Sequence, residues 1–429
     1  MQNSGPSSAI ELPVGVKDFL PKRAARMKSL EDSLYHEFRL WGYKEIITPA
    51  IEHLDVLAKG EPDLLETMFK FEDRVSGRML VLRPDFTAQI ARLVSTHLTE
   101  YPAPTRLSYS GSVFHYSGGK VNKQREIYQA GLELIGISNA EADGEVIAVA
   151  IGSILNTGLE DFKIDIGQVG FFRGVIEGLD ISDSMKKYVE DAIARKDRSG
   201  IENLLPSLHL KGSDEEALLA MPTMFGGRDV LDRAHNLSVN KKAKTALDNL
   251  SDVLDTIELY GLMDYITVDL GEIRRLNYYS GVIFEGFVSG MGEEICGGGR
   301  YDNLLNSYGH NMPATGFAIN LESLMKAIDG QCEKEELIRD GFLIVNRNSR
   351  RNDASMICKE LRAVGVSAVM EIEERDISES FAFAGRENLQ GIITIENGGI
   401  GKDEIYLHYV DGEDKQKLSM RDLIKKISG

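Results

Sequence analysis

The sequence predicts an α+β protein whose core is split by a helical insertion and followed by a small α/β domain. Three observations predict this organisation. Residues 1–173 and 263–327 mix strand and helix patterns, whereas residues 174–262 are helical and strand-poor. A charged stretch at residues 328–340 is typical of a linker, and residues 341–429 alternate strands with helices. At 429 residues the chain exceeds the roughly 250–300 residues of a single core, so several domains are expected.

The first core elements have clear patterns. Residues 22–42 repeat apolar side chains at helical spacing and end at a glycine, which predicts an amphipathic helix. Residues 43–57 follow as a strand. Residues 78–98 predict a strand, a turn and a helix that is capped by Asp85 or Thr87.

An antiparallel strand pair comes next. Residues 106–117 alternate in polarity, and residues 123–136 look like their antiparallel partner, reached through a turn at two glycines. Residues 141–157 predict a helix, and residues 162–172 a strand. After the insertion, strands resume, and a last core helix begins within FAINLESLMKAI. In the C-terminal domain the alternation predicts a largely parallel sheet.

Composition excludes several classes of protein. Apolar residues make up 42% and charged residues 27%, as in an ordinary globular chain, and no stretch approaches the roughly 18 apolar residues of a spanning helix. The N-terminus has no basic patch before an apolar core, so we expect no signal peptide. The three cysteines (Cys296, Cys332 and Cys358) are odd in number and lie in no metal-ligand spacing, which favours a reduced, cytoplasmic protein. Cys296, beside a glycine run, fits a buried small residue better than a nucleophile.

Charge disfavours nucleic acid as a partner. The net charge is −18, although a local basic patch could still bind RNA. From Arg339 onward, where a tRNA-reading module would lie, 14 basic residues face 16 acidic ones. A phosphate-binding face usually has a basic excess, so tRNA is not expected as a partner.

Motifs of other chemistries are absent from the sequence. It has no GxxxxGK[ST], GxSxG or HExxH motif, and its eight histidines are scattered. No phosphate-cradling loop is recognisable. We therefore expect no metal and no cofactor.

Seven segments in unbroken order carry a family resemblance: LP.G..D.LP, ITPAIEHLDVL, LRPDFTAQIAR, YSGSVFH with QREIYQAGLELIG, LNYYSGVIFE, GGGRYDNLL and ATGFAINLESL. The chain resembles histidyl-tRNA synthetase and, more closely, that enzyme's catalytically silent relatives, the ATP phosphoribosyltransferase regulatory subunits. The match covers most of residues 11–327. It implies the antiparallel sheet flanked by helices of class II aminoacyl-tRNA synthetases, with ITPAIEH at a homodimer interface. The C-terminal domain resembles a degenerate anticodon-binding domain.

The resemblance implies that a histidine pocket is retained. A free amino acid needs acceptors, a cation and a polar-aromatic slot. By resemblance, Asp85, Thr87 and Gln129 hold its ammonium and carboxylate, and Glu133 and Tyr279 hold its imidazole. Tyr301 lines the slot, and Arg274 faces the amino-acid carboxylate. The full predicted set is Asp85, Thr87, Arg125, Gln129, Glu133, Arg274, Tyr278, Tyr279 and Tyr301.

The sequence departs from the family at two nearby positions, and simpler interpretations exist for single residues. Asn277 replaces the usual aspartate and Arg275 the usual glycine. Taken singly, the tyrosines could be packing residues, Glu133 a solvated strand position, and GGGRYD a tight bend with a surface arginine. The shared order and spacing favour the pocket.

The resemblance also implies that an adjoining ATP pocket is lost. The synthetases hold the triphosphate with two arginines, whose positions here are His115 and Ser323, and the adenine-recognising carboxylate falls at Ser117. Losing one positioned charge-stabilising donor costs on the order of 10²–10³ in rate. Aminoacylation is therefore not expected.

The resemblance thus implies a non-catalytic regulatory subunit of histidine biosynthesis. It would assemble with the short-form catalytic ATP phosphoribosyltransferase subunit, as a hetero-octamer containing homodimers of this chain, and carry L-histidine for feedback inhibition. Two alternatives stay open: a divergent histidyl-tRNA synthetase that uses His115 in place of arginine, and a stand-alone sensor of histidine or uncharged tRNA.

Overall fold

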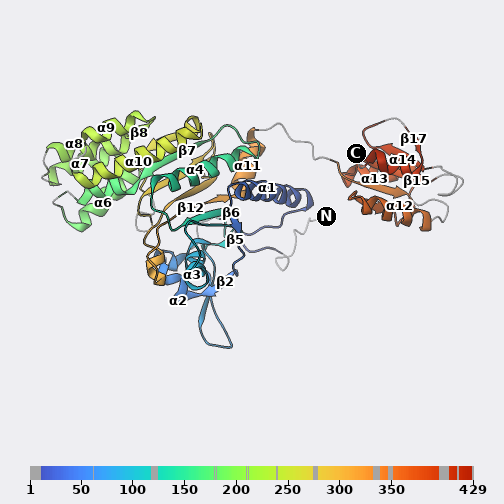
Figure 1. Cartoon of the computed structure of the whole chain (residues 1–429), viewed down its shortest axis with the longest axis horizontal. Coiled ribbons are helices and arrows are strands. Elements are labelled where there is room, and N and C mark those ends of the chain that lie inside the picture. Colours follow the sequence, from blue (N-terminus) through green and yellow to red (C-terminus); the bar gives the residue numbers. More distant parts are fainter. Residues whose placement is uncertain are drawn as a thin grey trace, which may run out of the picture. The chain divides into compact units, whose positions relative to one another are not determined.

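The structure is a computed structural model, and it divides into two compact units, Met1–Glu333 and Lys334–Gly429 (Figure 1). The residues that it describes are 11–60, 62–116, 124–177, 179, 181–208, 210, 212–237, 240–273, 279–331, 339–345, 351–395, 405–412 and 415–427. The two units are considered separately below.

The first unit is built on a nine-stranded sheet with the order β1-β5-β6-β12-β11-β10-β7-β9-β8. Its neighbouring strands are antiparallel except for the β1–β5 and β7–β9 pairs, so the predicted antiparallel class II sheet is confirmed. The strands are β1 Lys44–Glu45, β5 Thr105–Phe114, β6 Glu126–Ile135, β7 Lys163–Gln168, β8 Phe225–Gly226, β9 Ile266–Asp269, β10 Val282–Phe287, β11 Cys296–Arg300 and β12 Ala314–Asn320.

Helices cover both faces of this sheet, because successive side chains of its central strands point to opposite faces and both faces carry apolar residues. On β6, Leu132 and Leu134 pack in the large core with α1 (Pro21–Leu40) and α4 (Ala140–Leu155). On β5, Tyr109 packs in a second core with α3 (Thr87–His97). Glu133, between the two leucines, therefore points toward the α3 side.

The helical insertion packs continuously with the sheet domain. Its longest helix, α10 (Lys241–Leu259), is capped by Asn240, whose side chain accepts from Ala243 N at 2.9 Å. Residues of α10 share one apolar core with α4, and β8 of this region forms an edge of the large sheet, beside which α8 and α9 gather (Figure 1). The remaining helices here are α5 Val169–Glu177, α6 Asp183–Ala194, α7 Arg198–Leu208, α8 Gly212–Ala220 and α9 Asp229–Leu237. The exact domain boundaries stay a prediction.

Two predicted strands are shorter than expected, because a short apolar run does not distinguish a buried strand from a helix. β7 ends at Gln168, whose side chain accepts from Gly170 N, and α5 follows directly. Residues 43–57 form only β1 and β2 (Ile51–His53) before α2 (Leu54–Gly60) begins.

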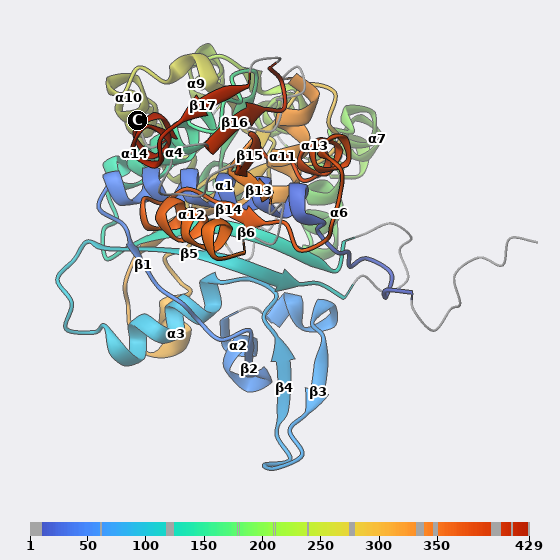
Figure 2. The same cartoon turned by 90° about the vertical axis from the view of Figure 1, so that its right-hand side faces the viewer.

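A small sheet of order β2-β4-β3 carries ITPAIEH. Figure 2 shows its hairpin, β3 (Lys70–Glu72) and β4 (Met79–Leu82), extending away from the large sheet. Several large apolar side chains on and beside it are exposed: Ile47, Ile51, Phe71, Val75 and Met79. The other elements of this unit are α11 Leu321–Gln331 and the 3-10 helices η2 Pro62–Thr67, η3 Met221–Thr223, η4 Met263–Tyr265 and η5 Leu305–Tyr308.

The C-terminal unit has a five-stranded sheet of order β14-β13-β15-β16-β17, and it corrects one expectation. Only the pairs of β13 with β14 and with β15 are parallel; β16 and β17 pair antiparallel, so the sheet is mixed rather than largely parallel. β15 and β16 are consecutive strands that pair directly with each other, and such a return of the chain is antiparallel. The elements are β13 Phe342–Val345, α12 Arg351–Ala363, β14 Ala368–Met370, α13 Ile377–Arg386, β15 Gly391–Ile395, β16 Ile405–Tyr409, β17 Gln416–Leu418 and α14 Met420–Ile427.

Throughout the described ranges, every helix is too short or too polar to cross a membrane.

Candidate functional site

A buried carboxyl group, that of Glu133, lies at the centre of the large sheet. Glu133 pairs with Leu107 on β5 and with Gly316 on β12, and it is 1% exposed. A Cβ atom at Gly316 would lie 1.7 Å from Glu133 Oε2, so only glycine at this position leaves room for the carboxylate. The sheet therefore provides a specific place for Glu133, and the interpretation as a solvated strand position is wrong.

Hydroxyl groups from two other elements bind this carboxylate. Thr87 Oγ1, at the start of α3, donates to Oε1 at 2.9 Å, and the Tyr301 hydroxyl donates to Oε2. Burial raises the pKa of Glu133 to about 8; the hydrogen bonds from Tyr301 and Thr87 oppose this shift, whereas the nearby negative charge of Asp85 adds to it. The structure thus brings Thr87, Glu133 and Tyr301 into direct contact.

Asp85 and two further tyrosines surround this contact. Asp85 accepts a long hydrogen bond from Ala88 N (3.4 Å), while the N-cap of α3 is Phe86, which makes no side-chain cap; the predicted caps Asp85 and Thr87 are therefore wrong. Tyr109 is buried, and burial together with the charges of Glu133 and Asp85 raises its pKa well above 10. Tyr279 lies in the same apolar cluster and also acts on Tyr109.

Sequence reasoning missed Tyr109. Its ring stacks on that of Phe86, with the ring centroids 4.3 Å apart and the planes at 22°. The Arg83 guanidinium lies 4.0 Å from the Phe86 ring centroid. A Cβ at Gly131 would come within 2.6 Å of the Tyr109 hydroxyl. The only sequence signal was its alternation with Leu107 on a predicted strand, which indicates the same face but not the partner across the sheet.

The other predicted site residues are placed less closely. Gln129 lies on β6 on the same face as Glu133 and is partly buried. Arg125 is partly buried just before β6; its amide donates to Gly15 O and its carbonyl accepts from His115 N. Arg274 and Tyr278, together with the substituted positions Arg275 and Asn277, lie outside the described residues.

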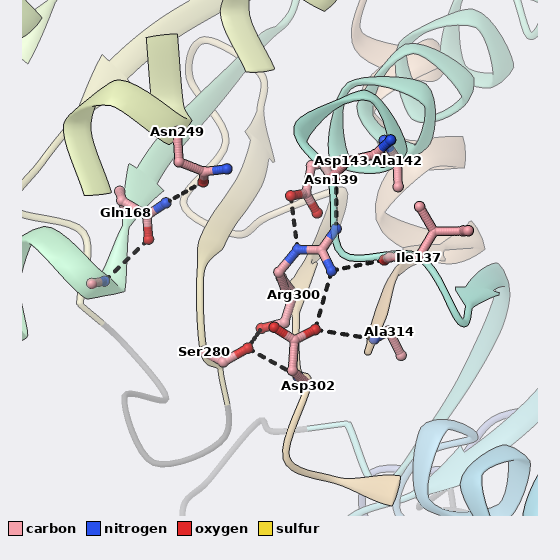
Figure 3. Close-up of polar contacts among 11 residues, drawn as sticks. Ile137, Asn139, Ala142, Asp143, Gln168, Asn249, Ser280, Arg300, Asp302 and Ala314 are labelled. Carbon is pink, nitrogen blue, oxygen red and sulfur yellow. Dashed lines mark hydrogen bonds and ion pairs between the residues drawn. The ribbon is translucent and has the colours of Figure 1, made fainter. Parts of the chain in front are cut away.

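The arginine of GGGRYD is a buried structural residue. Arg300 is 5% exposed, and its Nε donates to Asp143 Oδ2 of α4 at 2.8 Å. Figure 3 shows its guanidinium enclosed by α4, by the loop before it and by Asp302. The interpretation as a surface arginine at a tight bend is therefore wrong; the glycines belong to β11.

The region of the predicted ATP contacts is closed by the chain itself. Glu322, in the first turn of α11, is 2% exposed, forms an ion pair with Lys17 and accepts from Gln124 Nε2 at 2.8 Å. Ser323 follows, is 1% exposed, and donates its amide to the Asn320 side chain. His115 lies beside Arg125, and Ser117 lies outside the described residues. In place of the two arginines the structure thus has His115 and a buried serine.

The two regions differ in charge. None of the ion pairs among the described residues includes Asp85 or Glu133; Glu133 accepts hydrogen bonds from two hydroxyl groups, and Asp85 accepts one from Ala88 N. Such a site favours a cationic group with hydrogen-bond donors. No group of three or more potential metal ligands occurs in the part of the chain that the structure describes. Cys296 is buried, and burial raises the pKa of its thiol to about 12, so it is a packing residue, as predicted.

Comparison with known proteins assigns the class. The family model for histidyl-tRNA synthetase matches residues 15–324. The histidyl-tRNA synthetase of Nostoc sp. PCC 7120 superposes with a TM-score of 0.84 at 21% identity, over 97% of this chain and 98% of that one. The fold is thus that of the class II synthetases of the histidyl type.

Curated relatives identify the branch. ATP phosphoribosyltransferase regulatory subunits of Geobacter sulfurreducens and Syntrophotalea carbinolica are 39% and 41% identical, covering 97% and 90% of this chain and 95% and 90% of theirs. A structure titled ATP phosphoribosyltransferase regulatory subunit/histidyl-tRNA synthetase, from Bacillus halodurans, has a TM-score of 0.81 and 33% identity over 91% of this chain and 99% of its own. The chain belongs to the family of ATP phosphoribosyltransferase regulatory subunits, which function in histidine biosynthesis and are not themselves catalysts.

Proposed function

We propose that this chain binds L-histidine in the pocket around Glu133 and uses it to inhibit the catalytic ATP phosphoribosyltransferase subunit. The observation that carries the proposal is the buried carboxyl group of Glu133, which accepts from Thr87 and Tyr301 and forms no ion pair with any described residue. The proposed binding residues are those of the predicted set, including Arg274 and Tyr278 by resemblance.

The chemistry of the pocket matches the ligand. Histidine brings an ammonium group and imidazole N–H donors, and Glu133 and Asp85 supply acceptors without a competing cation in the described chain. The aromatic rings of Tyr109, Tyr279 and Tyr301 supply an apolar wall, which suits a flat imidazole. Bound histidine would also offset the cost of burying the Glu133 charge.

We further propose that the chain acts inside a larger assembly. The relatives' name implies a catalytic partner subunit, and the family resemblance implies a hetero-octamer in the cytoplasm. Exposed apolar residues on the small sheet and beside it, such as Ile51, Phe71 and Ile47, support a homodimer interface there. Feedback then requires that histidine bind the low-activity arrangement more tightly, with a coupling of typically about 1–3 kcal/mol.

Reconstitution tests the proposal. The full chain is added to a purified short-form catalytic subunit, and phosphoribosyl transfer is measured against L-histidine concentration. We expect activity to rise when the chain is added and to fall again with histidine. If adding the chain does not change the transferase rate, the proposed partnership is wrong. If the rate rises but does not respond to histidine, the proposed histidine regulation is wrong. Histidine-dependent ATP–pyrophosphate exchange by the chain alone would favour the synthetase alternative.

A further inference from the structure

We infer that Arg300 is a positioning residue for the pocket: its guanidinium fixes the two chain segments that carry Tyr279 and Tyr301. The inference deepens the proposed histidine site and rests on it for its binding readout. Arg300 itself does not touch the pocket. It is the last residue of β11 and directly precedes Tyr301. Because successive side chains of a strand point to opposite faces, Arg300 lies on the α4 side and Tyr301 on the Glu133 side.

All three nitrogens of the guanidinium are used. Nε donates to Asp143 Oδ2 (2.8 Å), Nη2 to Asn139 O (3.2 Å), and Nη1 to both Ile137 O (3.0 Å) and Asp302 Oδ1 (3.1 Å). These acceptors come from α4, from the loop before α4 and from the chain after β11 (Figure 3). The planar fork of arginine can satisfy this set at once, whereas a lysine ammonium cannot.

Asp302 connects Arg300 to the chain segments that carry Tyr279 and Tyr301. Its Oδ1 accepts from Arg300 and from Ala314 N (3.1 Å), and its amide donates to Ser280 Oγ (2.9 Å). The Ser280 amide in turn donates to Arg300 O (2.7 Å). Tyr301 is thus held between two anchored neighbours, and Tyr279 precedes an anchored serine.

The packing around the Arg300 stem leaves little freedom. A Cβ at Gly281, the residue after Ser280, would lie 3.0 Å from Arg300 Cδ. Because residue 281 is a glycine, the aliphatic part of the Arg300 side chain can pack against the backbone of the segment that carries Tyr279. A lysine at residue 300 has a single ammonium group in place of the planar guanidinium, so it would leave Asp143, Asp302 or the carbonyls before α4 without a donor. The chain segments that carry Tyr279 and Tyr301 would then shift.

A displaced Tyr301 can be detected at Glu133. The carboxyl of Glu133 is faced by Asp85 and Thr87 at the start of α3, by Tyr109 of β5 and by Tyr301. Because the Tyr301 hydrogen bond opposes the upward shift of the Glu133 pKa, its loss raises that pKa further. A purely structural role for Arg300 would lower stability without moving this titration.

The test compares Arg300→Lys and Ser280→Ala with the wild-type full chain. Ser280→Ala keeps the Arg300–Asp143 ion pair and the Ser280 amide bond to Arg300 O, and removes only the contacts of the Ser280 hydroxyl with Asp302 N and Arg300 O. It therefore tests the same positioning role if Arg300→Lys folds poorly. Calorimetric titration with L-histidine from about pH 6 to about pH 9 should show binding weakened by about tenfold or more in Arg300→Lys, and less in Ser280→Ala. The pH at which affinity changes should move upward in both.

A second readout needs no ligand. Carbon-13 NMR of the glutamate carboxyls, with the Glu133 signal assigned by Glu133→Gln, should show the Glu133 titration displaced to higher pH in both variants. Arg106→Lys is the matched control, because Arg106 binds Glu145 through two 2.7 Å hydrogen bonds away from the pocket. It should lower the melting temperature while the Glu133 titration and histidine affinity stay at wild-type values.

The outcomes separate the two proposals. Wild-type affinity and an unmoved Glu133 titration in both variants would overturn the positioning role. A wild-type chain that binds no histidine, while the Glu133 titration still moves in Arg300→Lys, would remove the proposed function and keep the positioning role.

Discussion

Two buried glutamates, Glu133 in the pocket and Glu322 at the start of α11, are 1% and 2% exposed but are compensated differently. Glu322 is paired by the chain itself, through the ion pair with Lys17 and the hydrogen bond from Gln124. Among the described residues Glu133 accepts from the hydroxyls of Thr87 and Tyr301, and burial raises its pKa to about 8. The described chain thus supplies Glu322 with a cation, whereas it supplies Glu133 with none, which is what the proposed binding of a cationic ligand would provide.

This difference separates a closed region from a binding region on one scaffold. Burying an uncompensated charge costs stability, so a fold that keeps one without a ligand has a weak point there. At α11 the described cation, Lys17, is paired with Glu322, and Ser323 is buried. We therefore propose that the chain retains the amino-acid half of the synthetase site, while Lys17, Gln124 and Ser323 occupy the region of the predicted ATP contacts.

The largest expected effect follows from replacing the Glu133 carboxyl, which forms no ion pair with any described residue. Glu133→Gln keeps the size of the side chain and an acceptor for Thr87, but it cannot neutralise a cation. We expect histidine affinity to fall by about 100-fold or more, because a charge-assisted buried contact is lost. Calorimetric titration measures this. Glu293→Gln, at a surface ion pair with Lys326, is the control and should bind histidine as the wild type does. Equal affinity in Glu133→Gln and Glu293→Gln would show that histidine binding does not depend on the Glu133 carboxyl.

Gly316 tests whether the sheet is shaped for Glu133. In Gly316→Ala the new Cβ would meet Glu133 Oε2 at 1.7 Å and Leu132 O at 2.4 Å, so β6 and β12 must separate. We expect a loss of at least about 3 kcal/mol in the free energy of unfolding, together with loss of histidine binding.

Gly297→Ala on β11 is the matched control, because its nearest atoms lie at 3.8 Å and 3.9 Å. It should change stability by less than about 1 kcal/mol. Urea unfolding of both variants checks the pair, and similar stabilities would contradict the shaped cavity.

The carboxyl of Glu133 should also make the stability of the folded chain depend on pH. The folded pKa of Glu133, about 8, exceeds its ordinary value of 4.5, so between these values the folded chain retains a proton that the unfolded chain has released. Stability should therefore fall as pH rises through this window, with a limiting slope of about 1.4 kcal/mol per pH unit. Urea unfolding of wild type and Glu133→Gln at several pH values isolates this contribution. A difference between the two that does not change with pH would contradict it.

Local patterns and motif order predicted most of this molecule. Helical periodicity over residues 22–42 located α1, and the ordered motifs located the β5–β6 pair and the Thr87–Glu133–Tyr301 set. The failures are non-local. The burial of Arg300 depends on carbonyls and a carboxylate at the start of α4, more than 150 residues away, and Tyr109 approaches the pocket only because Gly131 lies opposite it. The mixed C-terminal sheet depends on where β16 returns, which no local pattern encodes.

The smallest expected effect lies at α11, in the region that the chain has closed. The Ser323 hydroxyl is buried and has no hydrogen-bond partner among the described residues, so Ser323→Ala removes an unsatisfied group. The free energy of unfolding should stay equal or rise by up to about 1 kcal/mol, and histidine affinity should not change. Thr87→Val makes a similar hydroxyl deletion in the pocket, but that hydroxyl donates to Glu133, so affinity should fall there. Thermal unfolding and calorimetry on the two variants measure both quantities. A loss of histidine affinity in Ser323→Ala would mean that the α11 region still belongs to the binding site, and the two buried glutamates would then serve one pocket rather than two separate regions.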